Sequence, residues 1–183
     1  GIPAAQALGL DDVVLEFELT ANRADCFSVI GIAREVAALT GKELRFPSIT
    51  VEETASESAA ELVHIGIEAQ ELCRRFSARV LRNVKIAPSP AWMAKRLEDA
   101  GIRAINNVVD VTNFVMLELG QPMHAYDWAQ IAGKKLTARL AAKGEELHTL
   151  DDSSRRAKGT ELVIADAEKA AGLAGVMGGL ESE

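Results

Sequence analysis

The chain has 183 residues, of which 48% are hydrophobic and 4% aromatic, and its formal net charge at pH 7 is −7. The apolar fraction is large enough for a buried core and excludes a fully disordered chain. The acidic charge argues against general nucleic-acid binding, and the few aromatic residues argue against a sheet that stacks bases. Any contact with RNA should therefore be local, or be made by a partner.

The two cysteines, Cys26 and Cys73, lie far apart and neither belongs to a CxxC pair. We therefore expect neither a disulfide framework nor a metal site, and we predict a cytoplasmic location. An apolar run of about 18 residues is absent and the first residues are unlike a signal peptide, so we expect no membrane contact. Because the sequence starts without Met and stops without a helix cap, we expect a piece of a longer protein.

Residues 1–46 predict a strand followed by a helix. The stretch 13–19 (VVLEFEL) alternates apolar and acidic residues, which is typical of a strand. Over residues 26–40 the apolar positions recur at helical spacing, with Asp25 as the expected N-cap and Gly41 as the stop. One strand and one helix cannot bury a core alone, so this block should need further chain or a partner.

Residues 47–61 predict an acidic linker. The sequence has no Lys or Arg between Arg45 and Arg74, and large apolar residues are few in this segment. Like charges repel along it, so we expect a mobile or extended segment. The acidic residues concerned are Glu52, Glu53, Glu57 and Glu61.

Residues 62–183 predict strands on both sides of a pair of helices. Strand-like patterns occur at 62–69, 75–87, 135–141, 145–150 and 161–167, with a turn at 151–154. The expected fold class is therefore α+β, with mixed sheets and helices grouped mid-chain, preceded by the strand–helix piece.

The two helices have recognisable ends. Ser89 and Pro90 should open the first helix, and Gly101 should close it. Asn106 or Asn107 should cap the second helix, which Gly120 should end.

The second helix carries Thr112 and Asn113 inside an apolar run, and His124 follows after a turn at Pro122. A buried polar group without a partner costs about 1–3 kcal/mol. Thr112 can bond to the helix backbone, and His124 can be a half-buried histidine that bonds to backbone. Alternatively, these polar groups face a ligand, since a rigid turn suits a functional site.

Three further stretches have open interpretations. The run 174–179 (AGVMGG) is a pocket wall or a strand-end turn, because it lacks the phosphate-loop pattern. Arg103 is an anion or substrate contact, or a solvated cation. NRADC (22–26) has no His base nearby in sequence, so we interpret it as a helix entry rather than a cysteine nucleophile.

Residues alone thus predict one candidate pocket, lined by Thr112, Asn113, His124 and 174–179. Such a pocket could hydrolyse an activated ester by placing a water molecule, or it could only bind.

Three stretches of the sequence resemble a known family: ELTANRADCFSVIGIAREVAALTG, WMAKRLEDAGIRAINNVVDVTNFVMLELGQPMHAYD and LVIADAEKAAGLAGVMGGLESE. They are similar to the beta chain of bacterial phenylalanyl-tRNA synthetase, and the resemblance is colinear over essentially the whole chain. It implies that residues 1–46 are the second half of a split N-terminal domain. Residues 47–61 would be a linker, and residues 62–183 an editing domain, the composite third and fourth domain, truncated at its C-terminal side.

The family's aminoacylation site lies on its alpha chain, and this region of the beta chain hydrolyses tyrosine wrongly attached to tRNA(Phe). The resemblance implies catalytic roles for His124 and Asn113. It implies substrate contacts from Thr112 and Arg103. It also implies that Ala174 and Gly175 form a wall of the pocket that must stay small to admit an aromatic ring.

The resemblance also implies partners and cofactors. The alpha subunit would complete an alpha2-beta2 heterotetramer that binds tRNA(Phe), and ATP and Mg²⁺ would serve the whole enzyme, with no cofactor in this stretch. The family's Glu that accepts the tyrosine hydroxyl would lie beyond Glu183, so we expect the chain alone to act poorly on Tyr-tRNA. Two alternatives stay open: a free-standing trans-editing hydrolase, and a non-catalytic scaffold that docks the alpha chain and tRNA.

Overall fold

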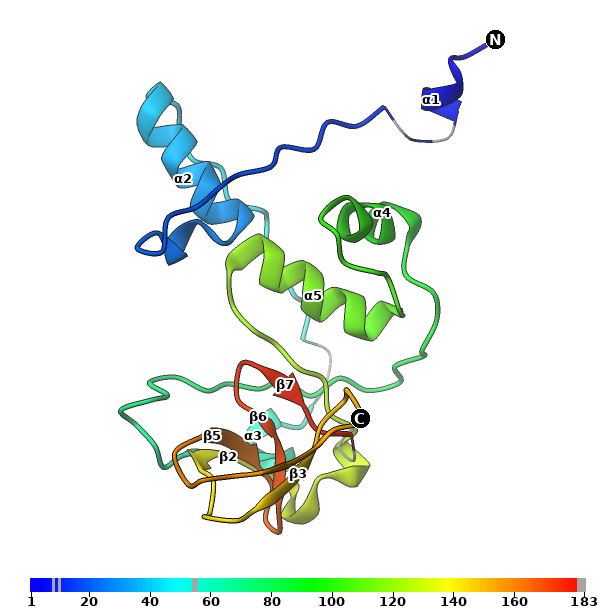
Figure 1. Ribbon diagram of the computed structural model, residues 1–183. Helices are drawn as coiled ribbons and strands as arrows, with labels where there is room; N and C mark the ends of the chain where they lie inside the picture. The colour runs from blue at the N-terminus through cyan, green and yellow to red at the C-terminus, as the bar shows by residue number, and fades with distance from the viewer. Residues whose placement is uncertain (8, 10, 54–55, 181–183) are drawn as a thin grey trace. The chain divides into compact units, whose positions relative to one another are not determined.

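The computed structural model describes residues 1–7, 9, 11–53 and 56–180. Contacts group the chain into two compact units, one of residues 1–46 with 86–121 and one of residues 47–85 with 122 onward. We call them unit 1 and unit 2. Unit 1 contains helices and unit 2 contains the strands, so the predicted α+β class is confirmed (Figure 1). The predicted division into family domains, at 1–46, 47–61 and 62–183, is a different partition and stays a prediction.

Unit 1 is built on the helix α5 (Asn107–Leu119), which α2 (Val29–Thr40) and α4 (Ala91–Asp99) both contact. Met93 and Leu97 bury the inner side of α4, and the rings of Trp92 and Phe114 meet edge to face with centroids 5.4 Å apart. The helical elements of this unit are α1 (Ala4–Ala7), η1 (Ala24–Cys26), α2 (Val29–Thr40), α4 (Ala91–Asp99) and α5 (Asn107–Leu119).

The ends of these helices follow local chemistry. Asn106 caps α5, because its side-chain oxygen accepts from the backbone N–H groups of Val108 and Val109, both at 3.0 Å. Gly120 ends the same helix with φ of 75°, in the left-handed region that favours glycine. Gly41 ends α2 in the same way, with φ of 64°. These predictions are confirmed.

Two predicted caps are wrong. Ser28 caps α2 by accepting from Gly31 N at 3.1 Å, whereas Asp25 lies in η1 and pairs with Arg23 at 2.8 Å. Ser89 does not cap α4. Its hydroxyl donates instead to the carboxylate of Asp110, and α4 begins after Pro90 without a side-chain cap.

Two predicted strands, at 13–19 and 75–87, form neither helix nor strand in the structure. Alternation shows that a segment can pair, but a strand also needs a neighbour to complete its backbone ladder. Over 13–17 the large apolar side chains are more than half exposed, namely Val13, Val14, Leu15 and Phe17.

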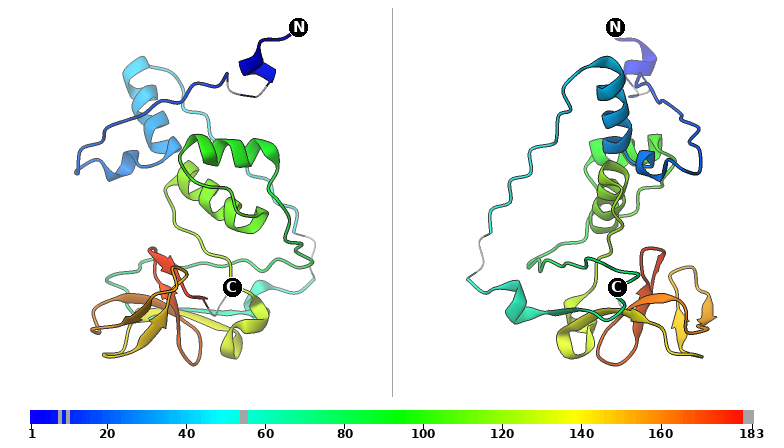
Figure 2. Two further views of the ribbon diagram at one scale, coloured as in Figure 1. Left: turned by 45° about the vertical axis from the view of Figure 1, so that its right-hand side comes forward. Right: turned by 90° about the vertical axis from the view of Figure 1, so that its left-hand side faces the viewer.

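Unit 2 contains a five-stranded mixed sheet in the order β1-β2-β5-β6-β7 (Figures 1 and 2). Its strands are β1 (His64–Ile67), β2 (Lys135–Leu140), β5 (Leu162–Ala165), β6 (Ala170–Leu173) and β7 (Met177–Gly178). The β1–β2 pair is parallel, with His64 opposite Lys135, and the other pairs of this sheet are antiparallel. A separate hairpin joins β3 (Glu146–His148) to β4 (Ser154–Arg156).

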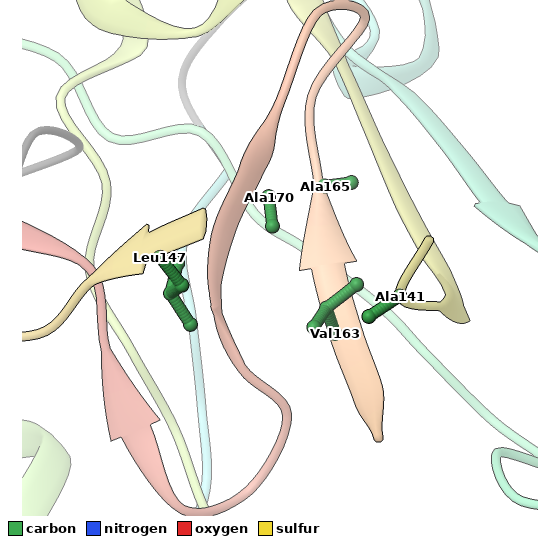
Figure 3. Packing of buried hydrophobic residues seen from close by; sticks show 5 residues of the cluster. All are labelled: Ala141, Leu147, Val163, Ala165 and Ala170. Atoms are coloured by element: carbon green, nitrogen blue, oxygen red, sulfur yellow. The ribbon is translucent and has the colours of Figure 1, made fainter. Parts of the chain in front are cut away.

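Successive side chains of β5 point to opposite faces of this sheet. Val163 and Ala165 point into one apolar cluster, while Ile164 belongs to a second. Figure 3 shows the first cluster, where β5 and β6 face the hairpin strand β3. Its buried members are Ala141, Leu147, Val163, Ala165 and Ala170, and the second cluster has Ile131, Leu136, Ala138 and Ile164. The small alanines allow the backbones to approach closely.

The acidic segment before this sheet is paired with basic residues of 75–87. Glu53 pairs with Arg79 at 3.0 Å, and Glu57 pairs with Arg82. A short helix, α3 (Ala59–Leu62), begins at Ser58 with a reciprocal capping box. Short 3-10 turns, η2 (Trp128–Gln130) and η3 (Ala132–Lys134), lead into β2.

None of the helices formed by the described residues combines the length and the apolar character needed to cross a membrane.

Candidate functional site

His124 is half-buried in unit 2, two residues after Pro122. Its ring meets Tyr126 edge to face, with centroids 4.7 Å apart and planes at 81°. Burial raises the pKa of Tyr126 to about 12, so this neighbour stays a neutral phenol at physiological pH. The imidazole therefore lies against a largely apolar, uncharged ring.

The other side of the His124 ring lies against β7 at Gly178. A Cβ atom at this glycine would lie 2.4 Å from His124 Cε1 and 2.8 Å from its buried Nε2. It would also lie 2.9 Å from Leu150 Cδ1. The imidazole thus occupies space that any side chain at residue 178 would fill. The sequence predicted a wall from 174–179, but the part that Gly178 plays was missed.

Ala174 and Gly175 form the turn between β6 and β7 in the same unit. Gly175 has φ of 70°, and a Cβ there would be 3.7 Å from Pro122 Cγ. Ala174 packs against the second apolar cluster. Unit 2 therefore brings this small-residue turn next to the turn that leads to His124.

Thr112 and Asn113 are half-buried on α5 in unit 1. The Thr112 hydroxyl donates to the carbonyl of Val109 at 2.7 Å, as predicted for a threonine that bonds back to its own helix. Its oxygen keeps lone pairs, so toward a ligand this hydroxyl acts as an acceptor.

Arg103 is exposed in the segment that joins α4 to α5. The same segment is tied to α5 by a residue that sequence reasoning missed, the fully buried Asp110. An acidic residue among the valines of the first turn of this helix was the signal that could have revealed it.

The six predicted site residues thus divide between the units. Arg103, Thr112 and Asn113 belong to unit 1. Unit 2 holds His124, Ala174 and Gly175. Their action at one site stays a prediction.

A cluster near η1 places Asp25, Cys26 and Glu35 with potential ligand atoms within 4.8 Å of one another. The guanidinium of Arg23 already pairs with both carboxylates of this cluster, at 2.8 Å from Asp25 and 2.6 Å from Glu35. Burial raises the pKa of the Cys26 thiol, which disfavours the nucleophilic thiolate. These contacts fit the predicted helix entry better than a catalytic cysteine.

A cavity of about 270 Å³ lies in unit 2, and none of the six predicted residues lines it. Leu147, Ala157 and Val163 contribute to its apolar lining, and Arg156 contributes a charge.

Comparison with known proteins shows the family to which the chain belongs. The family model described as B3/4 domain matches residues 72–183. The chain is 51% identical over 183 residues to the phenylalanine–tRNA ligase beta subunit of Anaeromyxobacter dehalogenans. It is 50% identical to that of Moorella thermoacetica and 47% identical to that of Geobacter metallireducens, again over 183 residues.

These alignments cover 100% of the chain but 23% of each relative, so the chain spans about a quarter of the length of the proteins that it matches. The chain belongs to the B3/4 domain family, and it is homologous over its whole length to a region of the phenylalanine–tRNA ligase beta subunit.

Proposed function

We propose that this chain is the editing region of a phenylalanine–tRNA ligase beta subunit and hydrolyses tyrosine wrongly attached to tRNA(Phe). The observation that carries the proposal is His124, whose imidazole lies against the bare backbone of Gly178 and the ring of Tyr126. A polar ring held by apolar neighbours is suited to orienting a reacting group. Homology to a region of the phenylalanine–tRNA ligase beta subunit supports a tRNA-linked substrate.

The proposed hydrolysis needs no strong catalytic base, because an aminoacyl ester is already reactive. His124 and Asn113 orient a water molecule toward the ester carbonyl, which supplies proximity and orientation without a strong base. The Thr112 hydroxyl donates to Val109, so it can accept a hydrogen bond from the substrate's ammonium group.

Substrate contacts come from small and basic residues. Ala174 and Gly175 leave space for an aromatic ring, and the exposed Arg103 attracts the phosphates near the end of the tRNA. An apolar wall separates Tyr from Phe weakly. Strong preference for Tyr requires a group that hydrogen-bonds the phenol.

The rest of the enzyme follows from the same proposal. The alpha subunit carries aminoacylation with ATP and Mg²⁺, and it assembles with the beta subunit as an alpha2-beta2 heterotetramer that binds tRNA(Phe) in the cytoplasm. In this scheme residues 1–46 belong to a split N-terminal domain, residues 47–61 to a linker, and residues 62–183 to the editing domain.

The direct test is hydrolysis of Tyr-tRNA(Phe) by the full enzyme carrying His124→Ala or Asn113→Ala. Each variant should lower the hydrolysis rate by at least about tenfold, because each removes a group that orients the water. Charging of tRNA with phenylalanine should not change. The matched control is His148→Ala, which removes an exposed histidine of the same unit. Hydrolysis at the wild-type rate in both site variants would contradict the proposal.

A non-catalytic docking module is a second candidate. The observation in its favour is the exposed apolar run over 13–17 in unit 1, which suits contact with another segment or chain. If this interpretation holds, Val14→Asp should weaken assembly of the full enzyme, while His124→Ala should leave hydrolysis intact.

A further inference from the structure

Asp110 is the most completely buried carboxyl group among the described residues, with 0% of its surface exposed. Burying such a group is costly unless its oxygens accept hydrogen bonds. One oxygen, Oδ2, accepts from the hydroxyl of Ser89 at 2.5 Å, and the other, Oδ1, accepts from the backbone N–H of Ile105 at 2.9 Å. Each carboxyl oxygen thus accepts a hydrogen bond from a donor within unit 1.

The two donors come from different segments. Ser89 lies just before α4, while Ile105 lies just before α5. A second pair of hydrogen bonds also attaches the segment before α4 to α5, because Asn107 exchanges hydrogen bonds with Ala87 at 2.9 and 3.1 Å. The first turn of α5 therefore fixes both ends of the stretch that contains α4.

The consequence concerns Arg103. This residue stands two positions before Ile105, on the short segment that Asp110 ties to α5. Thr112 and Asn113 stand on the same helix, within one turn of Asp110. The carboxyl group of Asp110 thus links the candidate substrate cation to the helix that bears the candidate polar pair.

We propose that Asp110 is a positioning residue for ester hydrolysis, which acts by holding the Arg103 segment against the first turn of α5. This inference rests on the proposed editing function. Asp110 touches neither the substrate nor the reacting water, and its effect passes through the placement of Arg103.

The test compares Asp110→Ala with Asp110→Asn in the full enzyme. Alanine removes both acceptors, so single-turnover hydrolysis of Tyr-tRNA(Phe) should fall by about tenfold or more. Asparagine keeps an acceptor for Ile105 N, and its amide can donate to the Ser89 oxygen, so hydrolysis should stay within about threefold of wild type. An equal loss in both variants would overturn the positioning role.

A double-mutant cycle with Arg103→Ala separates positioning from general destabilisation. Since Asp110 acts through Arg103, adding Asp110→Ala to Arg103→Ala should lower hydrolysis no further. Independent, multiplied losses, or no effect of Arg103→Ala alone, would overturn the inference. Ser89→Ala removes a single bond and serves if Asp110→Ala does not fold. It should cause a smaller loss, about threefold, that also disappears in the Arg103→Ala background.

His124→Ala, measured in parallel, distinguishes failure of the proposed editing function from failure of the positioning role of Asp110. Wild-type hydrolysis in that variant would sink the proposed function itself. Loss of hydrolysis in His124→Ala together with independent effects of Asp110 and Arg103 would sink only the positioning role.

Discussion

A single missing side chain decides where the candidate catalytic histidine can lie. Gly178 is not in the left-handed region, so its backbone would accept alanine without strain. The obstacle is the imidazole of His124, which occupies the position of the absent Cβ. The Gly-Gly pair was visible in the sequence, but only the fold shows which ring it accommodates.

We therefore expect Gly178→Ala to displace the His124 ring. A displacement near 1 Å should lower hydrolysis of Tyr-tRNA(Phe) by about 10- to 100-fold, with phenylalanine charging unchanged. Single-turnover deacylation by the full enzyme measures this effect. The control is Gly66→Ala, whose methyl group meets a threonine side chain, Thr137, with Oγ1 at 3.2 Å. Equal rates in the two variants would show that the ring position does not matter.

At the scale of elements, a carboxylate joins three strands of unit 2. Glu145 accepts two hydrogen bonds from the guanidinium of Arg139, at 2.7 and 2.8 Å, on β2. It also accepts from the backbone N–H groups of Ala142 and of Ala170, the first residue of β6. Because Glu145 directly precedes β3, these bonds hold the hairpin to the sheet.

This contact predicts a pH dependence of stability. The hydrogen bond from Arg139 lowers the pKa of Glu145 from 4.5 to about 2. A lowered pKa stabilises the folded state above pH 4.5, and this stabilisation disappears as pH falls toward 2. Allowing for solvent screening, the contribution is about 1–2 kcal/mol.

Glu145→Gln should remove most of this contribution at neutral pH and flatten its change between pH 4.5 and 2. Hydrogen exchange of the Ala170 amide in the full enzyme reports the local free energy of opening. Glu146→Gln, at an exposed neighbour on β3, is the control. A wild-type pH profile in the Glu145 variant would refute this role.

Helices were easier to predict from sequence than strands, for a local reason. The cap at Asn106 and the stops at Gly41 and Gly120 depend on a few neighbouring atoms, which the sequence contains. The strands predicted at 13–19 and 75–87 depend on a partner strand, which alternation cannot supply. In unit 2 the predicted strands β1, β2, β3 and β5 carry apolar residues that also fill a core, whereas β4, β6 and β7 were not predicted as strands.

At the scale of the whole molecule, contacts unite segments that are distant in sequence. Residues 86–121 group with 1–46, although the sequence pattern placed them with the strands that follow. Periodicity could not foresee this grouping, because it depends on which faces of α2, α4 and α5 pack together. The burial of the Asp110 carboxyl group was not predicted for the same reason, since its hydrogen-bond donors are 5 and 21 residues away in the sequence.

The central proposal is that Asn113 and His124 serve the same hydrolytic step. Single-turnover hydrolysis of Tyr-tRNA(Phe) by the full enzyme, in a double-mutant cycle of Asn113→Ala and His124→Ala, tests it most directly. Groups that serve the same water should be strongly non-additive, so the double variant should be scarcely slower than either single variant. Losses that simply multiply, or wild-type rates throughout, would contradict the account.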